Sequence, residues 1–246
     1  PDWSLAPWGC TAKCRAWARS IGLKAEAPDE AAVRTANSRR FSFSLESEWK
    51  VGLPGAGAMT TAAELDAELS RYDATEPWVL KAEFSMSARE RILGRGSKLA
   101  QNSRRWAEIR LERDGVLFLE PWVQRIEEWG AQFEIPRLGP PRILGVTRLI
   151  ADSQGRYLGS GLGGTLESDE FSGAIEIAEQ AAKRLQDAGY FGPAGIDMMR
   201  YRSEKEGAPR IRPLQDINAR WTMGRLAWEA RRFLRPGESG EWRHVR

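Results

Sequence analysis

Three oxygen-bearing side chains toward the end of the chain have the types and spacing of a metal-binding set. Asp197 lies in one apolar stretch, and Asp216 and Asn218 lie in another at 211–218. The polar loop at 203–209 separates the two stretches, which predicts an antiparallel hairpin. Residues two apart share a strand face, so Asp216 and Asn218 should point the same way, and Asp197 converges on them if it faces that side. Such ligands suit Mg²⁺, and the apolar flanks of all three argue against the alternative of a solvated hairpin.

Histidine and cysteine contribute little chemistry to this chain. His244 is the single histidine, and Cys10 and Cys14 are the two cysteines. One histidine builds neither a His-based catalytic triad nor a multi-histidine metal site, and it lies far along the chain from both thiols. We therefore expect two reduced thiols without zinc, and chemistry that rests on carboxylates, amides, lysine and arginine.

The composition is that of a globular protein with one large domain or two small ones. The 246 residues include 37 Lys plus Arg and 34 Asp plus Glu, for a net charge of +3, and 41% are hydrophobic. These values exclude disulfide scaffolds, collagen and disorder. No run approaches the roughly 18 apolar residues that span a bilayer, and the first residues lack a signal-peptide pattern. We expect a cytoplasmic location and no membrane partner.

The small basic excess does not by itself indicate a nucleic-acid partner. Acidic and basic residues alternate at 89–91 and 108–113, which is typical of a solvated face. Four of the eleven tryptophans lie within apolar runs, which favours core or pocket lining over a stacking platform for bases. These four are Trp78, Trp122, Trp129 and Trp221. We expect no nucleic-acid partner, and a basic, Trp-rich nucleic-acid-binding protein stays as an alternative.

Lys81 lies in a short apolar run at 78–84, which predicts a buried strand. A lysine near the end of such a strand places a point charge in a cleft, where a phosphate is a suitable partner; a lysine that extends from a core strand to solvent is the alternative. Between 85 and 103 the sequence is rich in Ser, Gly and Arg, which predicts a loop. The other predicted elements are helices at 11–21, at 62–72 with Thr61 and Glu64 as its capping box, and at 172–188 followed by Gly189, a short helix that opens at 27–30, and strands at 116–123, 131–135, 142–151 and 156–158.

The stretch 159–164 satisfies the Gly-x-Gly-x-x-Gly pattern of dinucleotide-binding proteins. That pattern requires a strand before it and a helix that opens within it. The next predicted helix begins only near Ser172, so we interpret 159–164 as a glycine-rich loop that follows a hairpin.

Taken in order, these features resemble the ATP-grasp superfamily, the ATP-dependent carboxylate–amine ligases that include D-alanine–D-alanine ligase, glutathione synthetase and biotin carboxylase. The resemblance covers about 37–233 and rests on several motifs in the right order. Residues 37–41 resemble the Asn-Asp-Lys stretch before the ATP-binding domain, 78–81 the strand whose lysine contacts phosphate, 85–96 the small-residue loop over the phosphates, 119–123 the hinge that cradles adenine, and Asp197, Asp216 and 218–220 the family's Asp, Glu-x-Asn and Asn-x-Arg set.

The resemblance implies an α+β ATP-grasp fold, in which two α+β subdomains with antiparallel sheets grip ATP. Residues 1–36 would be an N-terminal segment, the short or truncated remnant of the α/β domain that usually leads. Residues 37–246 would be the ATP-grasp domain, with a small subdomain at about 55–118 and a large subdomain at about 119–235.

The resemblance also implies a role for each candidate site residue, with ATP and Mg²⁺ (or Mn²⁺) as cofactors. Arg39 and Lys81 would hold phosphates; Glu120 and Val123, through their backbone, and Trp122 would cradle adenine; Glu127 or Glu128 would bind the ribose; Asp197, Asp216 and Asn218 would bind the metal; and Arg220 would bind the acyl phosphate or the acceptor carboxylate. Lys81 and Arg220 are the residues expected to be catalytic.

The implied reaction is a ligation. ATP phosphorylates a substrate carboxylate to an acyl phosphate, and an amine or thiol then displaces phosphate, so the expected partners are small-molecule or peptide substrates; a homodimer stays open. Three features depart from the family pattern: Arg39 stands where lysine is common, Asp216 where glutamate is usual, and the loop at 85–96 has fewer glycines. An inactive ATP-binding protein of the same fold is therefore the first alternative.

Overall fold

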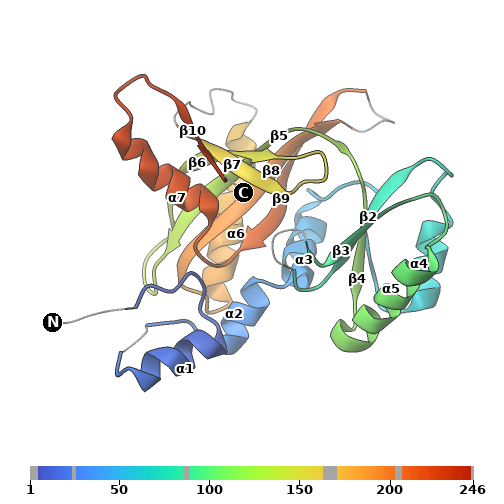
Figure 1. Ribbon diagram of the computed structural model, residues 1–246, viewed down its shortest axis with the longest axis horizontal. Helices are drawn as coiled ribbons and strands as arrows, with labels where there is room; N and C mark the ends of the chain where they lie inside the picture. The colour runs from blue at the N-terminus through green and yellow to red at the C-terminus, as the bar shows by residue number, and fades with distance from the viewer. Residues whose placement is uncertain (1–4, 24–25, 86–88, 163–170, 203–206, 245–246) are drawn as a thin grey trace.

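Two antiparallel sheets form the body of the chain (Figure 1). The computed structural model describes residues 5–23, 26–85, 89–162, 171–202 and 207–244. The smaller sheet contains β1 (Gly57–Met59), β2 (Pro77–Ala82), β3 (Arg91–Arg95) and β4 (Leu117–Pro121), and the larger sheet contains β5 (Gln124–Ile135), β6 (Arg142–Ala151), β7 (Tyr157–Leu162), β8 (Gly192–Arg202), β9 (Pro209–Asn218) and β10 (Gly240–Arg243). Their orders are β1-β4-β2-β3 and β10-β7-β6-β5-β8-β9. This architecture confirms the α+β class and the two antiparallel sheets that we expected.

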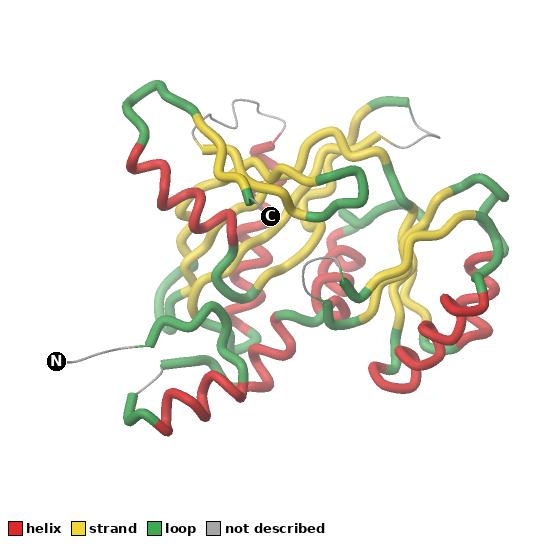
Figure 2. Tube along the Cα trace, viewed as in Figure 1, coloured by secondary structure: helices red, strands yellow, loops and turns green. Residues whose placement is uncertain are grey.

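Helices cover one face of each sheet (Figure 2). Helices α4 (Ala62–Leu69) and α5 (Gln101–Asp114) pack on the smaller sheet, and α6 (Ser172–Asp187) packs on the larger one. Each helix contributes its apolar stripe to a buried cluster: Leu65, Leu69 and Ala107 against the smaller sheet, and Ala178, Ala182 and Leu185 against the larger one. Burial of these stripes is the main favourable term that holds helices on sheets.

Two of the remaining helices, α7 (Met223–Ala230) and α3 (Arg39–Trp49), contact the larger sheet. Helix α7, extended by η2 (Arg231–Phe233), contacts β6 and β7. Gly145 permits this approach, because a Cβ there would lie 2.1 Å from the Trp228 ring of α7. Helix α3 contacts β9, and α2 (Glu30–Ala36) leads into it from α1 (Ala12–Ser20).

Patterns that depend on neighbouring residues are confirmed. Helix α6 ends at Asp187, and Gly189 has a φ of +84°, which suits the glycine expected after the helix. The hairpin of β8 and β9 pairs antiparallel as predicted. At the N-terminus of α4, Thr61 Oγ1 accepts from the Glu64 amide, and the Glu64 carboxylate accepts from the amide and the hydroxyl of Thr60.

The predicted loop at 85–103 is wrong at 91–95, which form a strand, and at 101–103, which begin a helix. Strand β3 pairs with β2, and α5 begins at Gln101. Gly94 looked like a loop residue, but a Cβ there would lie 2.1 Å from the Trp78 ring, so the strand needs glycine to cover that ring. Helix α5 escaped detection because of its helical residues only Ala107 is buried, which leaves little apolar periodicity.

Other elements also differ from the prediction, and β1, α7 and β10 were not predicted at all. Helix α3 forms at 39–49, where we expected only a motif, and β5 starts at Gln124 rather than 131. Gly159 lies within β7 and not in a loop. The position requires glycine, because a Cβ there would lie 2.2 Å from the backbone oxygen of Trp242 in β10. No helix opens at 159–162, which agrees with the rejection of a dinucleotide-binding motif.

Parts of three predictions lie outside the described residues. They are 86–88 of the loop over the phosphates, 163–164 of the glycine-rich stretch, and 203–206 of the hairpin loop. Within the described ranges, no helix is long and apolar enough to cross a membrane. Cys10 and Cys14 are free thiols.

Candidate active site

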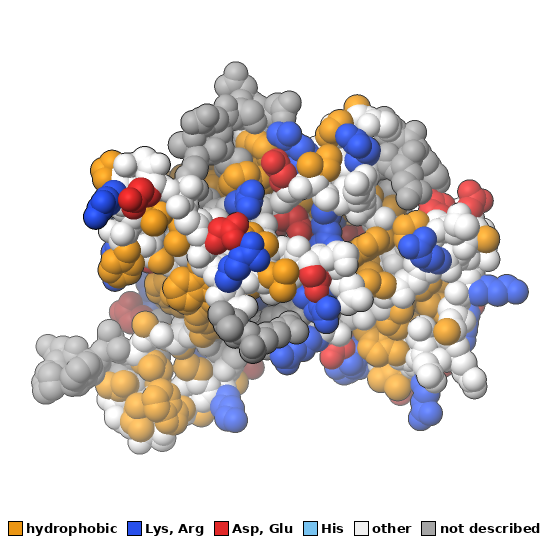
Figure 3. Space-filling model, turned by 45° about the horizontal axis from the view of Figure 1, so that its top comes forward, with side chains coloured by type: hydrophobic (Ala, Val, Ile, Leu, Met, Phe, Trp, Pro, Cys, Tyr) orange, Lys and Arg blue, Asp and Glu red, His pale blue; other side chains and the backbone are white. Residues whose placement is uncertain are grey.

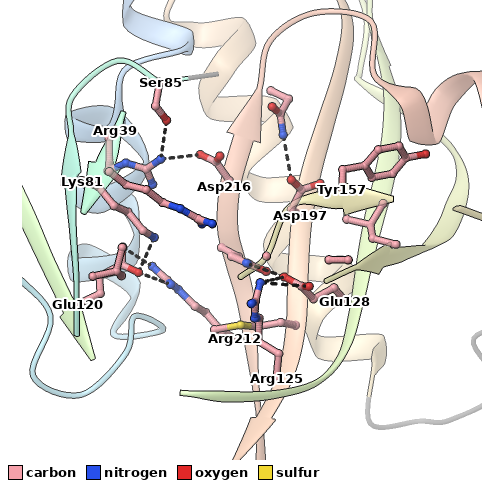
Figure 4. Close-up of a pocket in the computed structure, with 18 of the residues that line it drawn as sticks. Arg39, Lys81, Ser85, Glu120, Arg125, Glu128, Tyr157, Asp197, Arg212 and Asp216 are labelled. Atoms are coloured by element: carbon pink, nitrogen blue, oxygen red, sulfur yellow. Dashed lines mark hydrogen bonds and ion pairs between the residues drawn. The ribbon is translucent and has the colours of Figure 1, made fainter. Parts of the chain in front are cut away.

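A cavity of about 280 Å³ lies between the two sheets, just under the roughly 300–1,000 Å³ of typical ligand sites. Figure 4 shows its two walls, with Lys81 and Glu120 on the side of the smaller sheet and Asp197 and Asp216 on the larger one. Of the residues proposed from the sequence, the cavity is lined by Arg39, Lys81, Glu120, Trp122, Val123, Glu128, Asp197, Asp216, Asn218 and Arg220. Segments from 39 to 220 therefore meet at one site.

Glu127 is the exception among the proposed site residues. It lines a second pocket, and its carboxylate lies 3.7 Å from Arg200 Nε. Glu128 lines the cavity itself and faces Arg125 and Gln215. Of the two ribose candidates, only Glu128 therefore contributes to the cavity that holds the other proposed residues.

The acidic wall consists of three side chains on β8 and β9. Asp197 and Asp216 are directly opposite each other in the strand pair, and Asn218 Nδ2 donates to Asp197 Oδ2 at 3.0 Å. Burial, together with the nearby carboxylates of Asp216 and Glu128, raises the pKa of Asp197 to about 7. The Asp197 carboxyl group therefore retains its proton to a higher pH than an exposed aspartate does.

This donor set fits a magnesium ion that is held partly by substrate phosphates. Among the described residues no group of three or more His, Cys, Asp or Glu is placed to hold a metal alone. Two carboxylates and one amide oxygen are what Mg²⁺ uses when phosphates complete its shell. Asn218 Oδ1 accepts from Arg220 Nη2 at 2.7 Å and keeps a second lone pair for a cation.

A β-bulge adds a residue that the sequence analysis missed. The register of β8 and β9 shifts between Asp197 and Met199, and as a result both Gln215 and Asp216 line the cavity. Gln215 Nε2 donates to Glu128 Oε1 at 3.0 Å. Pro213 was the available signal, since proline within a strand indicates an edge or a bulge, and β9 is an edge strand.

The opposite wall carries a buried charge cluster. Lys81 Nζ donates to Glu120 Oε2 at 2.6 Å, and Arg212 Nη1 donates to the same oxygen at 2.9 Å. Arg212 also binds Glu46 on α3 through Nε at 2.5 Å and Nη2 at 2.8 Å. Sequence analysis proposed Lys81 and the backbone of Glu120 for this cluster and missed Glu46 and Arg212, which lie 166 positions apart in the chain.

The pKa values of this cluster follow from burial and charge. Burial lowers the pKa of Lys81 to about 8, and the Glu120 carboxylate opposes that shift. Burial alone would raise the pKa of Glu120, but the charges of Arg212 and Lys81 hold it below its ordinary value. Lys81 is therefore a cation at neutral pH that loses its proton more easily than an exposed lysine.

Arg39 connects the two walls. The N-terminus of α3 is anchored to the end of β2, because the Arg39 amide donates to Glu83 O at 3.0 Å and Ser38 Oγ donates to Glu83 Oε1 at 2.6 Å. The Arg39 guanidinium then lies 3.5 Å from Ser85 Oγ and 3.6 Å from Asp216 Oδ1. One cation thus faces both the expected phosphate loop and the acidic wall.

Two arginines that the sequence analysis missed surround Trp122. The guanidinium carbons of Arg91 and Arg125 lie 5.4 Å and 4.6 Å from the Trp122 ring centre. Arg91 donates to the Gln154 carbonyl and Arg125 to the Ser153 carbonyl, both in the turn between β6 and β7. The smaller sheet is therefore tied to this turn across the cavity.

Arg220 marks the other end of the cavity. Besides Asn218, its guanidinium donates to the Trp221 carbonyl at 3.3 Å, and the Trp221 amide donates to Trp8 O at 2.9 Å. Thr222 caps α7 and donates from its hydroxyl to buried Gln132 Oε1 at 2.6 Å. The arginine is thus held by the strand, by the following loop and by the N-terminal segment.

Comparison with known proteins identifies the fold. No protein-family model and no curated protein sequence matches the chain. Among solved structures, D-alanyl-alanine synthetase A from Vibrio cholerae is similar with a TM-score of 0.60 at 11% identity, over 87% of this chain and 64% of that one. N5-carboxyaminoimidazole synthetase from Staphylococcus aureus, in complex with ADP, gives 0.57 at 9% identity over 82% and 49%.

L-amino acid ligase from Bacillus licheniformis gives a TM-score of 0.58 at 14% identity, over 85% of this chain and 48% of that one. The chain thus spans between about half and two thirds of the length of these three proteins. All three are ATP-grasp enzymes, and their similarity extends over most of the present chain. The arrangement of the two sheets is similar to that in these proteins, and the chain has the ATP-grasp fold.

Proposed function

We propose that the protein is an ATP- and Mg²⁺-dependent ligase that joins a carboxylate to an amine or a thiol through an acyl phosphate. The observation that carries this proposal is the cavity itself, where cationic Lys81 and Arg39 face the oxygen donors of Asp197, Asp216 and Asn218. Phosphoryl transfer needs positioning and charge stabilisation more than a protein nucleophile. A site with neither histidine nor cysteine therefore suits it.

In the proposed reaction, an oxygen of the substrate carboxylate attacks the γ-phosphorus of ATP, and ADP leaves. The amine nitrogen or thiol sulfur then attacks the acyl carbon, loses its proton and displaces inorganic phosphate. Lys81 and Arg39 hold the phosphates, and Arg220 binds the acyl phosphate or the acceptor carboxylate with its planar fork. Asp197, Asp216 and Asn218 would hold Mg²⁺, and the bound ion would neutralise negative charge on the phosphates.

Trp122, Val123 and Glu128 are proposed to bind the nucleoside. Trp122 and Val123 follow β4 at the connection between the sheets, and both line the cavity. Glu128 lies on the facing strand β5, with Gln215 beside it. A carboxylate and a carboxamide oxygen are hydrogen-bond acceptors that suit the hydroxyl groups of a ribose.

Calorimetric titration with ATP, with and without Mg²⁺, tests the proposal. We expect magnesium-dependent binding by the wild type and its loss in an Asp197→Ala, Asn218→Ala variant. Asp187→Ala, on the exposed face of α6, is the matched control and should bind as the wild type does. No binding of ATP by the folded wild type would refute the proposal.

Turnover is tested separately with hydroxylamine as the amine. Incubation with Mg·ATP and a panel of amino acids, dipeptides and other carboxylates should give a hydroxamate and one ADP for each hydroxamate formed. A stoichiometric product from at least one carboxylate would establish ligation through an activated acyl group.

One observation favours a second candidate, a protein that binds ATP without ligation. Asp216 is shorter than the glutamate usual in the family and lies 3.6 Å from Arg39, which competes for its carboxylate. Magnesium-dependent ATP binding with neither hydroxamate nor ADP formation across the panel would support this candidate over the ligase.

A further inference from the structure

Four charged side chains, one of which is Lys81, come from four elements and form a buried cluster of hydrogen-bonded ion pairs. Glu46 comes from α3, Lys81 from β2, Glu120 from β4 and Arg212 from β9. The side chains of Glu46, Glu120 and Arg212 are 4%, 3% and 2% exposed, whereas that of Lys81 is 14% exposed and reaches the cavity. Lys81, Glu120 and Arg212 line the cavity, and Glu46 does not, so the cluster is a buried support in which the ammonium group of Lys81 is the most exposed charge.

Arg212 makes most of the hydrogen bonds in this cluster, and Lys81 makes one. Arg212 donates to both oxygens of Glu46 and to both oxygens of Glu120. Lys81 shares Glu120 Oε2 with Arg212, and this is its single hydrogen bond to a described residue. An ammonium group has three N–H donors, so Lys81 is held in place while donors remain for a ligand.

The charges of the cluster cancel as a set of four. When all four groups are ionised, Glu46 and Glu120 contribute two negative charges, and Arg212 and Lys81 contribute two positive ones; burial raises the pKa of Glu46, and the charge of Arg212 opposes that shift. Because buried charges interact strongly, the proton on Lys81 depends on all three partners and not on Glu120 alone. Arg39, the other cation next to Lys81, disfavours that proton further.

We propose that Glu46 and Arg212 are positioning residues that act through Glu120 to present a protonated Lys81 to the phosphates of the nucleotide. The inference rests on the proposed function, since it assigns Lys81 to those phosphates. Neither Glu46 nor Arg212 needs to contact the nucleotide. Their effect is on the orientation and the protonation of the lysine.

The arrangement requires the two residues to act with opposite sign. Removal of the Arg212 charge leaves Lys81 as the sole cation that donates to Glu120 within the cluster, which stabilises its ammonium form whether Glu46 stays ionised or takes up a proton. Removal of the Glu46 charge leaves Lys81 beside an arginine with one carboxylate to share, which destabilises it. A nearby charge typically shifts a pKa by about one unit or more, so the two variants should shift Lys81 by about one unit each in opposite directions.

The experiment measures the dissociation constant of Mg·ATP by calorimetry from about pH 7.5 to about pH 10, where ATP itself no longer titrates and Lys81 does. For the wild type we expect binding to weaken as pH rises through the pKa of Lys81. Arg212→Met should move this midpoint up by about one pH unit, and Glu46→Gln should move it down by about one. Lys81→Met should remove the pH dependence and so assigns it to the lysine.

Arg225→Met is the matched control. It also removes a largely buried arginine, which is ion-paired to Glu134 and Glu229 but lies away from Lys81. We expect its midpoint to equal that of the wild type. A general loss of packing would change the affinity for Mg·ATP at all pH values in both arginine variants. The positioning role instead moves the midpoint of the pH dependence, upward in Arg212→Met and downward in Glu46→Gln.

The outcomes separate the two proposals. Wild type that binds Mg·ATP, with midpoints unchanged in Glu46→Gln and Arg212→Met, would overturn the positioning role and leave the nucleotide site standing. Wild type that does not bind Mg·ATP would overturn both. If Arg212→Met does not fold, the downward shift in Glu46→Gln still decides the matter, because that variant keeps the Arg212–Glu120 pair.

Discussion

Replacement of Arg212 by methionine should strongly destabilise the folded protein near neutral pH. Methionine keeps most of the aliphatic volume but removes the guanidinium that neutralises Glu46 and Glu120, which are 4% and 3% exposed. Lys81 still compensates Glu120, so Glu46 must either stay charged without a partner or take up a proton. Loss of one partner of a buried ion pair costs about 3–5 kcal/mol.

The cost can be worked out from the protonation of one carboxyl group. A glutamate with an unfolded pKa of about 4.3 that must be protonated in the folded state costs about 1.36 kcal/mol per pH unit above that value. The loss is therefore about 4 kcal/mol at about pH 7.5 and about 1 kcal/mol at about pH 5. In the Arg212→Met variant the pKa of Glu46 in the folded state is raised above its value in the unfolded state, so the variant is most stable at low pH and loses stability as pH rises.

Urea unfolding followed by tryptophan fluorescence, at about pH 5 and about pH 7.5, measures the two losses. The Arg212→Met, Glu46→Gln double variant carries one carboxylate fewer, so most of the loss and most of its pH dependence should disappear. A loss below about 1 kcal/mol at the higher pH, or one that does not change with pH, would refute the charge assignment within the cluster.

Three further predictions concern the metal, the lysine and the packing of the smaller sheet. Asp197→Asn should weaken ATP binding about tenfold to a hundredfold in the presence of Mg²⁺ and little in its absence, because an interaction with a charged group is worth about 1.5–3 kcal/mol. An equal loss of affinity with and without Mg²⁺ would contradict the assignment of Asp197 as a metal ligand. In calorimetry, affinity of the wild type for Mg·ATP should fall by up to about tenfold per pH unit above about pH 8, where Lys81 loses its proton; a flat profile would exclude that lysine from the phosphate site. In thermal and urea unfolding, Gly94→Ala should lower the free energy of unfolding by about 1–3 kcal/mol, because its Cβ would lie 2.1 Å from the Trp78 ring. Gly173→Ala is the control: it is a helical position with nothing within 4 Å of the added Cβ, and it should raise the free energy of unfolding by about 0.5–1 kcal/mol. Equal effects of the two variants would show that the Trp78 ring moves freely.

The hairpin of β8 and β9 illustrates how far local pattern extends. Alternation along a strand placed Asp216 and Asn218 on one face, and the structure confirms that both line the cavity with Asp197. The bulge that also brings Gln215 there was not predicted, although Pro213 indicated an interrupted strand. A bulge depends on how two strands pair, and a single stretch of sequence does not contain that information.

The smaller sheet shows the opposite case, where local pattern was misleading. Gly94 belongs to β3, where it makes room for the Trp78 ring, and not to a loop. Figure 3 shows many exposed charged side chains, and on such a surface a helix such as α5 has little apolar periodicity to detect. For Gly94 the deciding contact is with Trp78 on the neighbouring strand, which the local pattern around Gly94 does not contain.

The sequence by itself determined the motif order that resembles the ATP-grasp superfamily, the hairpin of β8 and β9, and the charged and polar residues of the acidic wall. It could do so because strand alternation, helix caps and motif spacing are set by residues a few positions apart. Only the tertiary structure decided that Glu128 rather than Glu127 faces the cavity and that Glu46 and Arg212 support Lys81 from behind. These choices depend on strand register and on the docking of α3 between the sheets, where side chains separated by 166 positions form a buried ion pair whose strength comes from exclusion of water.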